Sequence, residues 1–328
     1  YTSLSIPFGY WTFNTSFSKS EYLTTVSGAT KDFHSSGNTI TQNYSLDKVL
    51  FRTNFFKTTL GSTLEIRDST GSRKSSNIVF YVNNVIYTKF GTIMIKPSYF
   101  KGMKWFDAKK DEDDLLDINP KMQYDLAKLY VYYNTQFRIP LLTKTNYIDK
   151  IDGSKKSLRN KIPIIYTLTL DSQYSFDTLY SIDQISIGGQ YTIRGFKENT
   201  ISGDIGYYLR NDIKINSYYL IPQTIKSMSF MRYNGIFSSS LNDILSKSFV
   251  SIFYDYGFVK NRYKIEPDLY NSNSGYMSGV GTSIRYYGKY LNASFTYSKA
   301  LQSPSYLYKR DLSKKENNNI YFDVGLVF

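Results

Sequence analysis

The sequence predicts an all-β protein, and more specifically a transmembrane antiparallel β-barrel. Aromatic residues make up 17% of its 328 residues, with 33 tyrosines and 22 phenylalanines. Barrels place such residues in their lipid-facing band and interfacial girdles. Apolar and polar residues alternate along most of the chain, which is the period of a β-strand. No apolar run approaches the roughly 20 residues of a membrane helix, so strands would have to make any crossing.

Strands are predicted in order from the first residues onward. Leu4, Ile6 and Phe8 alternate with small or polar residues, and a tight turn at Gly9 leads into a second strand from Trp11. The further alternating segments are residues 39–52, 55–67, 77–88, 91–103, 123–139, 163–174, 206–216, 248–259, 275–287, 290–301 and 318–328. The count is about thirteen strands, whereas single-chain bacterial barrels have even numbers.

Charged residues on one strand face distinguish a barrel from a soluble sandwich, whose strands also alternate. In residues 248–259 one face is apolar or aromatic from Val250 to Phe258, and the other carries Asp255. In residues 206–216 the polar face carries Arg210, Asp212 and Lys214. A water-filled lumen accepts such charges, whereas a dry sandwich core does not.

Short and long connections are predicted to alternate, as periplasmic turns and external loops do in barrels. Tight connections are expected near residues 9, 53–54, 89–90 and 288–289. Long ones are expected at 25–37, 68–76, 104–121, 175–205, 260–274 and 302–317. Two further long connections, 140–162 and 217–247, break the rhythm because short turns are expected there.

The residues that enzymes and metal sites use are scarce. Cysteine is absent, which excludes disulfides and thiolate metal sites. The only histidine, His34, falls in a predicted polar loop and has no partner histidine for a metal site or a catalytic triad. The acidic run 111–114 lacks the spacing of an EF-hand and is interpreted as an exposed loop. We therefore expect no enzyme, no bound metal and no cofactor.

The net charge of +13 raises the question of nucleic-acid binding. Lysine and arginine are spread through predicted turns and polar strand faces, with no single basic stripe or helix. The sequence therefore predicts no nucleic-acid partner.

Three short motifs carry the strongest functional signal. Residues 188–196 read GGQYTIRGF, residues 202–212 read SGDIGYYLRND, and residues 253–257 read FYDYG. Together they resemble the two-partner secretion transporters of the haemolysin-activator type, in the outer membrane of Gram-negative bacteria. The resemblance is densest over residues 183–212 and extends over the whole chain.

The resemblance implies that loop 175–205 enters the lumen and that its arginine pairs with the strand aspartate. The residues implied to anchor the loop are Ile193, Arg194, Gly195, Phe196, Phe253, Asp255 and Gly257. Those of the accompanying loop motif are Gly188, Gly189, Ser202, Gly203, Asp204, Gly206 and Arg210. Glycine lets backbone segments approach closely, which explains Gly195 and Gly257. The alternative is that Arg194 is an ordinary exposed loop arginine.

Both ends of the chain fit the same family. The last strand carries Phe322, Val324, Leu326 and Phe328, and resembles the C-terminal signal that the barrel assembly machinery recognises. In the family, sixteen strands follow two periplasmic recognition domains. Matching residues 7–11 to the turn after the fourth family strand implies a chain truncated at its N-terminus. Residues 1–328 would then be a barrel without its first three strands and its recognition domains.

The implied function is a pore that moves a large partner exoprotein, haemolysin- or adhesin-like, from the periplasm to the cell surface without nucleotide hydrolysis. The pore would be a monomer surrounded by outer-membrane lipid. Two alternatives stay open: a barrel-assembly insertase of the same superfamily, and a diffusion porin.

Overall fold

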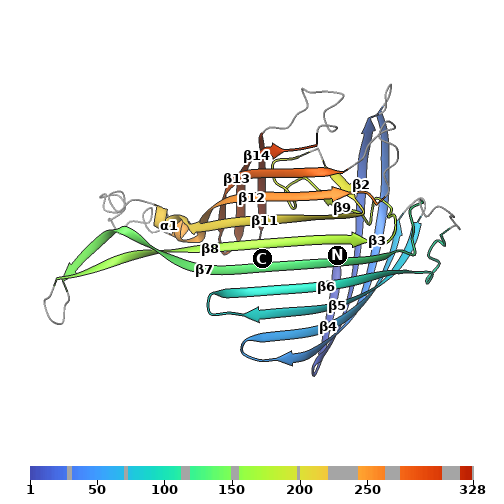
Figure 1. Cartoon of the computed structure of the whole chain (residues 1–328), viewed down its shortest axis with the longest axis horizontal. Helices are drawn as coiled ribbons and strands as arrows, with labels where there is room; N and C mark the ends of the chain where they lie inside the picture. Colours follow the sequence, from blue (N-terminus) through green and yellow to red (C-terminus); the bar gives the residue numbers. More distant parts are fainter. Residues whose placement is uncertain are drawn as a thin grey trace.

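A computed structural model describes residues 1–27, 32–69, 73–111, 119–148, 155–197, 200–220, 243–262, 274–304 and 318–326. Thirteen strands form one sheet in the order β1-β2-β3-β4-β5-β6-β7-β8-β11-β12-β13-β14-β15, and every neighbouring pair is antiparallel. Figure 1 shows this sheet curving round into a barrel-like wall. The predicted all-β class and the predicted strand number are both confirmed.

The strands follow the chain almost one by one. Their bounds are β1 Thr2–Phe8, β2 Trp11–Ser27, β3 Asp32–Arg52, β4 Phe56–Ser69, β5 Arg73–Tyr87, β6 Gly91–Met103, β7 Asp125–Ile148, β8 Lys155–Ser175, β11 Ile205–Asn216, β12 Ser248–Lys260, β13 Gly275–Tyr287, β14 Leu291–Gln302 and β15 Asn318–Leu326. Between β8 and β11 lie two short strands, β9 Ile185–Ile187 and β10 Ile201–Gly203, which form their own sheet. A short helix, α1, spans Ser217–Leu220, and residues 243–247 just before β12 are also helical.

The two faces of the sheet differ as the alternation predicts. On β12, Ile252 is 61% exposed and Tyr254 is 46% exposed. The alternate residues Phe253 and Asp255 are only 2% and 0% exposed. We call the face that carries Phe253 and Asp255 the inner face. Rows of exposed Ile, Leu, Phe and Tyr on the other face form the surface that hydrocarbon covers in a barrel.

The four predicted tight connections are present. Gly9 takes a φ of 60° in the β1–β2 turn, a conformation that favours glycine. Each of the next two turns contains a threonine whose hydroxyl accepts hydrogen bonds from the backbone. Thr53 accepts from the N–H groups of Phe55 and Phe56, and Thr88 accepts from those of Phe90 and Gly91. Local side-chain hydrogen bonds thus close these turns.

Several predicted loops are wrong because strands run through them. β2 and β3 stay paired as far as Ser27 and Asp32, so 25–37 is mostly strand, and His34 lies in β3 instead of a loop. β7 and β8 likewise stay paired as far as Ile148 and Lys155 across the predicted connection 140–162. Figure 1 shows this ribbon projecting beyond the sheet. These segments lack clear apolar alternation, but backbone pairing in a ribbon does not require it.

The other connections are described only in part. The connection 68–76 is shorter than predicted, since β4 ends at Ser69 and β5 begins at Arg73. Residues 221–242, most of the predicted connection 217–247, lie outside the described residues, as do 112–118, 263–273 and 305–317. Among the helices that the structure describes, none has the length and apolar character to cross a membrane.

Candidate functional site

The connection between β8 and β11 packs against the inner face of the sheet. It comprises residues 176–204, close to the predicted loop 175–205. β9 and β10 pair antiparallel within it, with Ile187 opposite Ile201. The loop contributes Ile185, Ile187, Ile193, Phe196 and Ile201 to a buried cluster that also contains Val259 of β12 and Met277 of β13. The loop is therefore held against the wall by a small apolar core to which both the loop and the wall contribute.

Arg194 is bound at this interface by the predicted aspartate. Its side chain is 2% exposed, so it is not an exposed loop arginine. Its Nε lies 2.6 Å from Oδ2 of Asp255, and its Nη2 lies 2.6 Å from Oδ1 of the same residue. The backbone N–H of Arg194 donates to Asp255 as well, at 3.0 Å. A bidentate pair of this kind fixes orientation as well as charge.

A second carboxylate completes the site, and sequence reasoning did not name it as a partner. Nη1 and Nη2 of Arg194 donate to the two oxygens of Asp212 at 2.8 and 3.3 Å. The Phe253 ring centroid lies 3.5 Å from the guanidinium carbon, a cation–π distance. Asp212 and Phe253 are opposite one another in the β11–β12 register. The available signal was that Asp212 shares the polar face of its strand with Arg210.

The charges in the site balance. Burial opposes the charge on Arg194, but the hydrogen bonds and charges of Asp255 and Asp212 outweigh it and raise the pKa of Arg194 above its usual value. Arg210 lies opposite Asp255 in the register and donates from Nη1 to the backbone oxygen of Tyr191 at 2.8 Å. The buried Arg194, Asp212 and Asp255 thus lie beside the partly buried Arg210. Removing one member of such a group typically costs about 3–5 kcal/mol, because it leaves a buried charge unpaired.

Glycines let the loop tip approach the wall. Gly195 has a φ of 115°, and a Cβ there would lie 2.9 Å from the backbone nitrogen of Ala300. A Cβ on Gly257 would lie 2.7 Å from Cδ1 of Ile193. The closest approach is at Gly279 of β13, where a Cβ would lie 1.8 Å from the Arg194 carbonyl oxygen. Gly279 was not predicted, because β13 carries no motif that sets it apart.

The last strand also holds the loop tip. The Tyr321 hydroxyl donates to the backbone oxygen of Phe196 at 2.8 Å, and Asn319 Nδ2 donates to that of Gly195 at 2.5 Å. Gln190 donates to the carboxylate of Asp323. The tip is therefore attached to β11 and β12 through charges and to β15 through neutral and charged hydrogen bonds.

Residues 202–206 of the second motif lie where the loop rejoins the sheet at the start of β11. Asp204 accepts hydrogen bonds from the backbone of Leu179 at 3.0 Å, from Gln184 Nε2 at 3.0 Å and from the backbone of Arg262 at 2.9 Å. Ser202 pairs with Ser186 across the β9–β10 ladder. Close backbone contacts explain the glycines, since a Cβ would lie 2.7 Å from Lys260 O at Gly203 and 2.5 Å from Phe258 O at Gly206.

The remaining motif glycines shape the turn before the arginine. Gly188 and Gly189 have φ values of 108° and 105°, in the region that side chains disfavour. The Gly189 N–H donates to the backbone oxygen of Ile193 at 3.0 Å. This turn places Ile193 and Arg194 directly against the wall.

The predicted C-terminal signal lies on the outer face. Phe322, Val324 and Leu326 are 69%, 54% and 66% exposed, while Phe328 lies outside the described residues.

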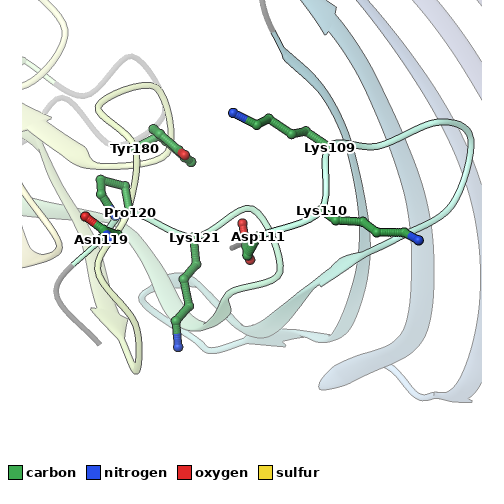
Figure 2. A pocket seen from close by; sticks show the side chains of 7 residues that line it. All are labelled: Lys109, Lys110, Asp111, Asn119, Pro120, Lys121 and Tyr180. Atoms are coloured by element: carbon green, nitrogen blue, oxygen red, sulfur yellow. The ribbon is translucent and has the colours of Figure 1, made fainter. Parts of the chain in front are cut away.

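A cavity beside the start of the loop has no evident ligand chemistry. It is lined by Lys109, Lys110, Asp111, Asn119, Pro120, Lys121 and Tyr180. Figure 2 shows Lys109 reaching toward Tyr180, whereas Lys110 and Lys121 point away from the opening. Lys121 is paired with Asp177 at 3.2 Å. In the described part of the chain no group of three or more His, Cys, Asp or Glu side chains could hold a metal ion.

The fold and this site together define a class: a barrel-like antiparallel β-sheet protein with a loop held against its inner wall by a buried arginine. A family model identifies the protein family within this class. The chain belongs to the haemolysin secretion/activation proteins ShlB/FhaC/HecB, whose model matches residues 1–236. The family predicted from the motifs is thereby confirmed.

Individual proteins show the same similarity. The outer membrane transporter CdiB of Dickeya dadantii is 28% identical over 226 residues, which are 66% of this chain and 36% of that protein. The hemolysin transporter protein HpmB of Proteus mirabilis is 26% identical over 250 residues, 72% of this chain and 41% of HpmB. The solved structure of CdiB from Escherichia coli has the same fold, with a TM-score of 0.73 at 22% identity over 99% of this chain and 52% of that one. The chain thus spans about half or less of these proteins.

Proposed function

We propose that this chain forms the channel of a two-partner secretion transporter, and that residues 176–204 are its internal plug. In this proposal a partner exoprotein enters from the periplasm in extended form and leaves at the cell surface. Membership of the family supports this function, as do the transporter names of CdiB and HpmB. The barrel acts as a monomer, and folding of the partner outside the cell gives transport its direction, without nucleotide hydrolysis.

The observation that carries the proposal is the buried pairing of Arg194. A loop arginine that is 2% exposed, with two carboxylates of the wall around it, is too well paired for a passive surface loop. A barrel of sixteen or so strands leaves an aqueous channel, so a folded-in loop would block it. The loop must then move during transport, and its pairing with Asp255 and Asp212 would set how readily it does so.

The experiment is a secretion assay with the full-length transporter and its partner. Arg194→Glu places a third acidic side chain beside Asp255 and Asp212, and we expect it to abolish secretion. The double variant Arg194→Glu with Asp255→Arg re-creates one opposite-charge pair and should restore part of it. Lys19→Gln is the matched control, because Lys19 is 50% exposed and forms a surface ion pair with Glu21, which is 69% exposed. Normal secretion by Arg194→Glu would refute the plug mechanism and leave the fold unaffected.

A further inference from the structure

The loop has a second charged attachment, on a distant part of the wall. Nη1 of Arg67 on β4 lies 3.0 Å from Oδ1 of Asp183, near the start of the loop. In the sheet β5, β6 and β7 lie between β4 and β8, the strand from which the loop departs. The contact is therefore not between neighbouring strands. It ties the loop to a second part of the wall, away from the strands β11 and β12 that hold Arg194.

Residues around this pair hold both partners in place. Nη2 of Arg67 also lies 2.8 Å from Oε1 of Glu65, which accepts a further hydrogen bond from Asn77 at 3.3 Å. Glu65 and Arg67 are two residues apart on one strand and so share its inner face. On the loop side, the backbone oxygen of Asp183 accepts a hydrogen bond from Gln173 Nε2 at 3.0 Å. The backbone N–H of Asp183 donates to the backbone oxygen of Tyr180 at 2.9 Å.

Both members of the Arg67–Asp183 pair are largely buried. The side chain of Asp183 is 5% exposed and that of Arg67 18%. Burial raises the pKa of the Asp183 carboxyl above its usual value, and the charge of Arg67 acts against that rise. The buried Tyr124 also interacts with Asp183. Arg67 is thus the cation that pairs with a nearly buried carboxyl group.

The two attachments are built with opposite polarity. At the tip, the loop supplies the cation, Arg194, and the wall keeps both carboxylates. At the start of the loop, the wall supplies the cation and the loop supplies only Asp183. When the loop moves away, Arg67 keeps Glu65 as a partner, whereas Arg194 leaves both of its partners behind. Opening at Arg67 separates one buried carboxylate, Asp183, from its cation, whereas opening at the tip separates Arg194 from two carboxylates and therefore costs more.

We propose that Arg67 and Asp183 form a latch that closes the channel between the loop and β4, and that the latch must open for the partner polypeptide to pass. This inference rests on the proposed channel function. It assigns Arg67, Asp183 and Glu65 a role in transport separate from that of Arg194. The latch opens first and reversibly, and release of Arg194 follows.

Channel recordings with the full-length transporter in planar lipid bilayers test the latch. Arg67→Gln and Asp183→Asn should each raise the frequency of open events by roughly tenfold, the factor that 1.4 kcal/mol corresponds to. The double variant Arg67→Asp with Asp183→Arg should return the frequency toward that of the original protein, since the new cation would face Glu65 as well. Lys19→Gln again serves as the control, and heat-modifiable migration on gels verifies that each variant is folded. An unchanged frequency in both single variants would overturn the latch.

A reversible cross-link tests whether the latch has to open. This chain contains no cysteine, so Arg67→Cys with Asp183→Cys introduces a unique pair in it. A short bismaleimide with a reducible disulfide should stop secretion of the partner when it joins the two positions, and reduction should restore it. Secretion at the full rate by the cross-linked protein would overturn the proposal. If that happened while Arg194→Glu still abolished secretion, the latch alone would fall; a full-length transporter that secretes no partner at all would refute the channel function itself.

Discussion

Asp255 and Asp212 both bind Arg194, but neutralising them is expected to have unequal effects. Asp255 is 0% exposed and accepts three hydrogen bonds from Arg194, two from the guanidinium and one from the backbone. Asp212 is 12% exposed and accepts two, one of them at 3.3 Å. The substitutions Asp255→Asn and Asp212→Asn remove one charge each with almost no change in size.

The magnitudes follow from these contacts. Breaking a fully buried ion pair costs about 3–5 kcal/mol, so Asp255→Asn should raise the ratio of released to attached loop by a hundredfold or more, at about 1.4 kcal/mol per tenfold. Hydrogen bonds to a charged group contribute about 1.5–3 kcal/mol. Asp212→Asn should therefore raise the same ratio by roughly ten- to a hundredfold. The predicted order is Asp255→Asn above Asp212→Asn.

Limited trypsin digestion measures loop release directly. Trypsin cleaves after arginine, and the bond that follows Arg194 is inaccessible while the loop is attached, since Arg194 and Phe196 are 2% and 0% exposed. The initial cleavage rate there reports the released fraction. Asp68→Asn is the matched control, because Asp68 is 52% exposed and lies 4.0 Å from Lys74, which is 48% exposed. Equal rates for the two variants, or a faster rate for Asp212→Asn, would refute the argument from burial.

Two further predictions concern the packing of the loop tip. Gly279→Ala should displace the tip and speed cleavage after Arg194, because a Cβ would lie 1.8 Å from the Arg194 oxygen. Gly325→Ala is its control and should behave as the original protein, because a Cβ there meets no atom within 4 Å. Equal cleavage rates for the two alanine variants would contradict this prediction. Tyr321→Phe removes the hydrogen bond to the Phe196 oxygen and should weaken the attachment by about 0.5–1.5 kcal/mol, seen as a several-fold rise in cleavage. An unchanged rate would show that water replaces the hydroxyl at no cost.

The sequence by itself determined the class of fold and the central residue of the site. Period-two alternation and aromatic content predict a barrel, since a sheet with lipid on one side and water on the other requires both. The motifs around Arg194 and Asp255 indicated a pairing that the structure places at 2.6 Å. The alternation failed at 25–37 and 140–162, where β2 with β3 and β7 with β8 remain paired as far as the described residues reach.

Tertiary structure decided everything that depends on register and curvature. Asp212 became a partner of Arg194 only because β11 and β12 align it with Phe253. Gly279 matters because β13 passes beside the loop tip. Arg67 meets Asp183, 116 residues further along the chain, because the sheet bends β4 round to face the loop. Local sequence patterns report which way a side chain points along its own strand. They do not report what lies across the inner side of the sheet, because that depends on the curvature of the whole sheet.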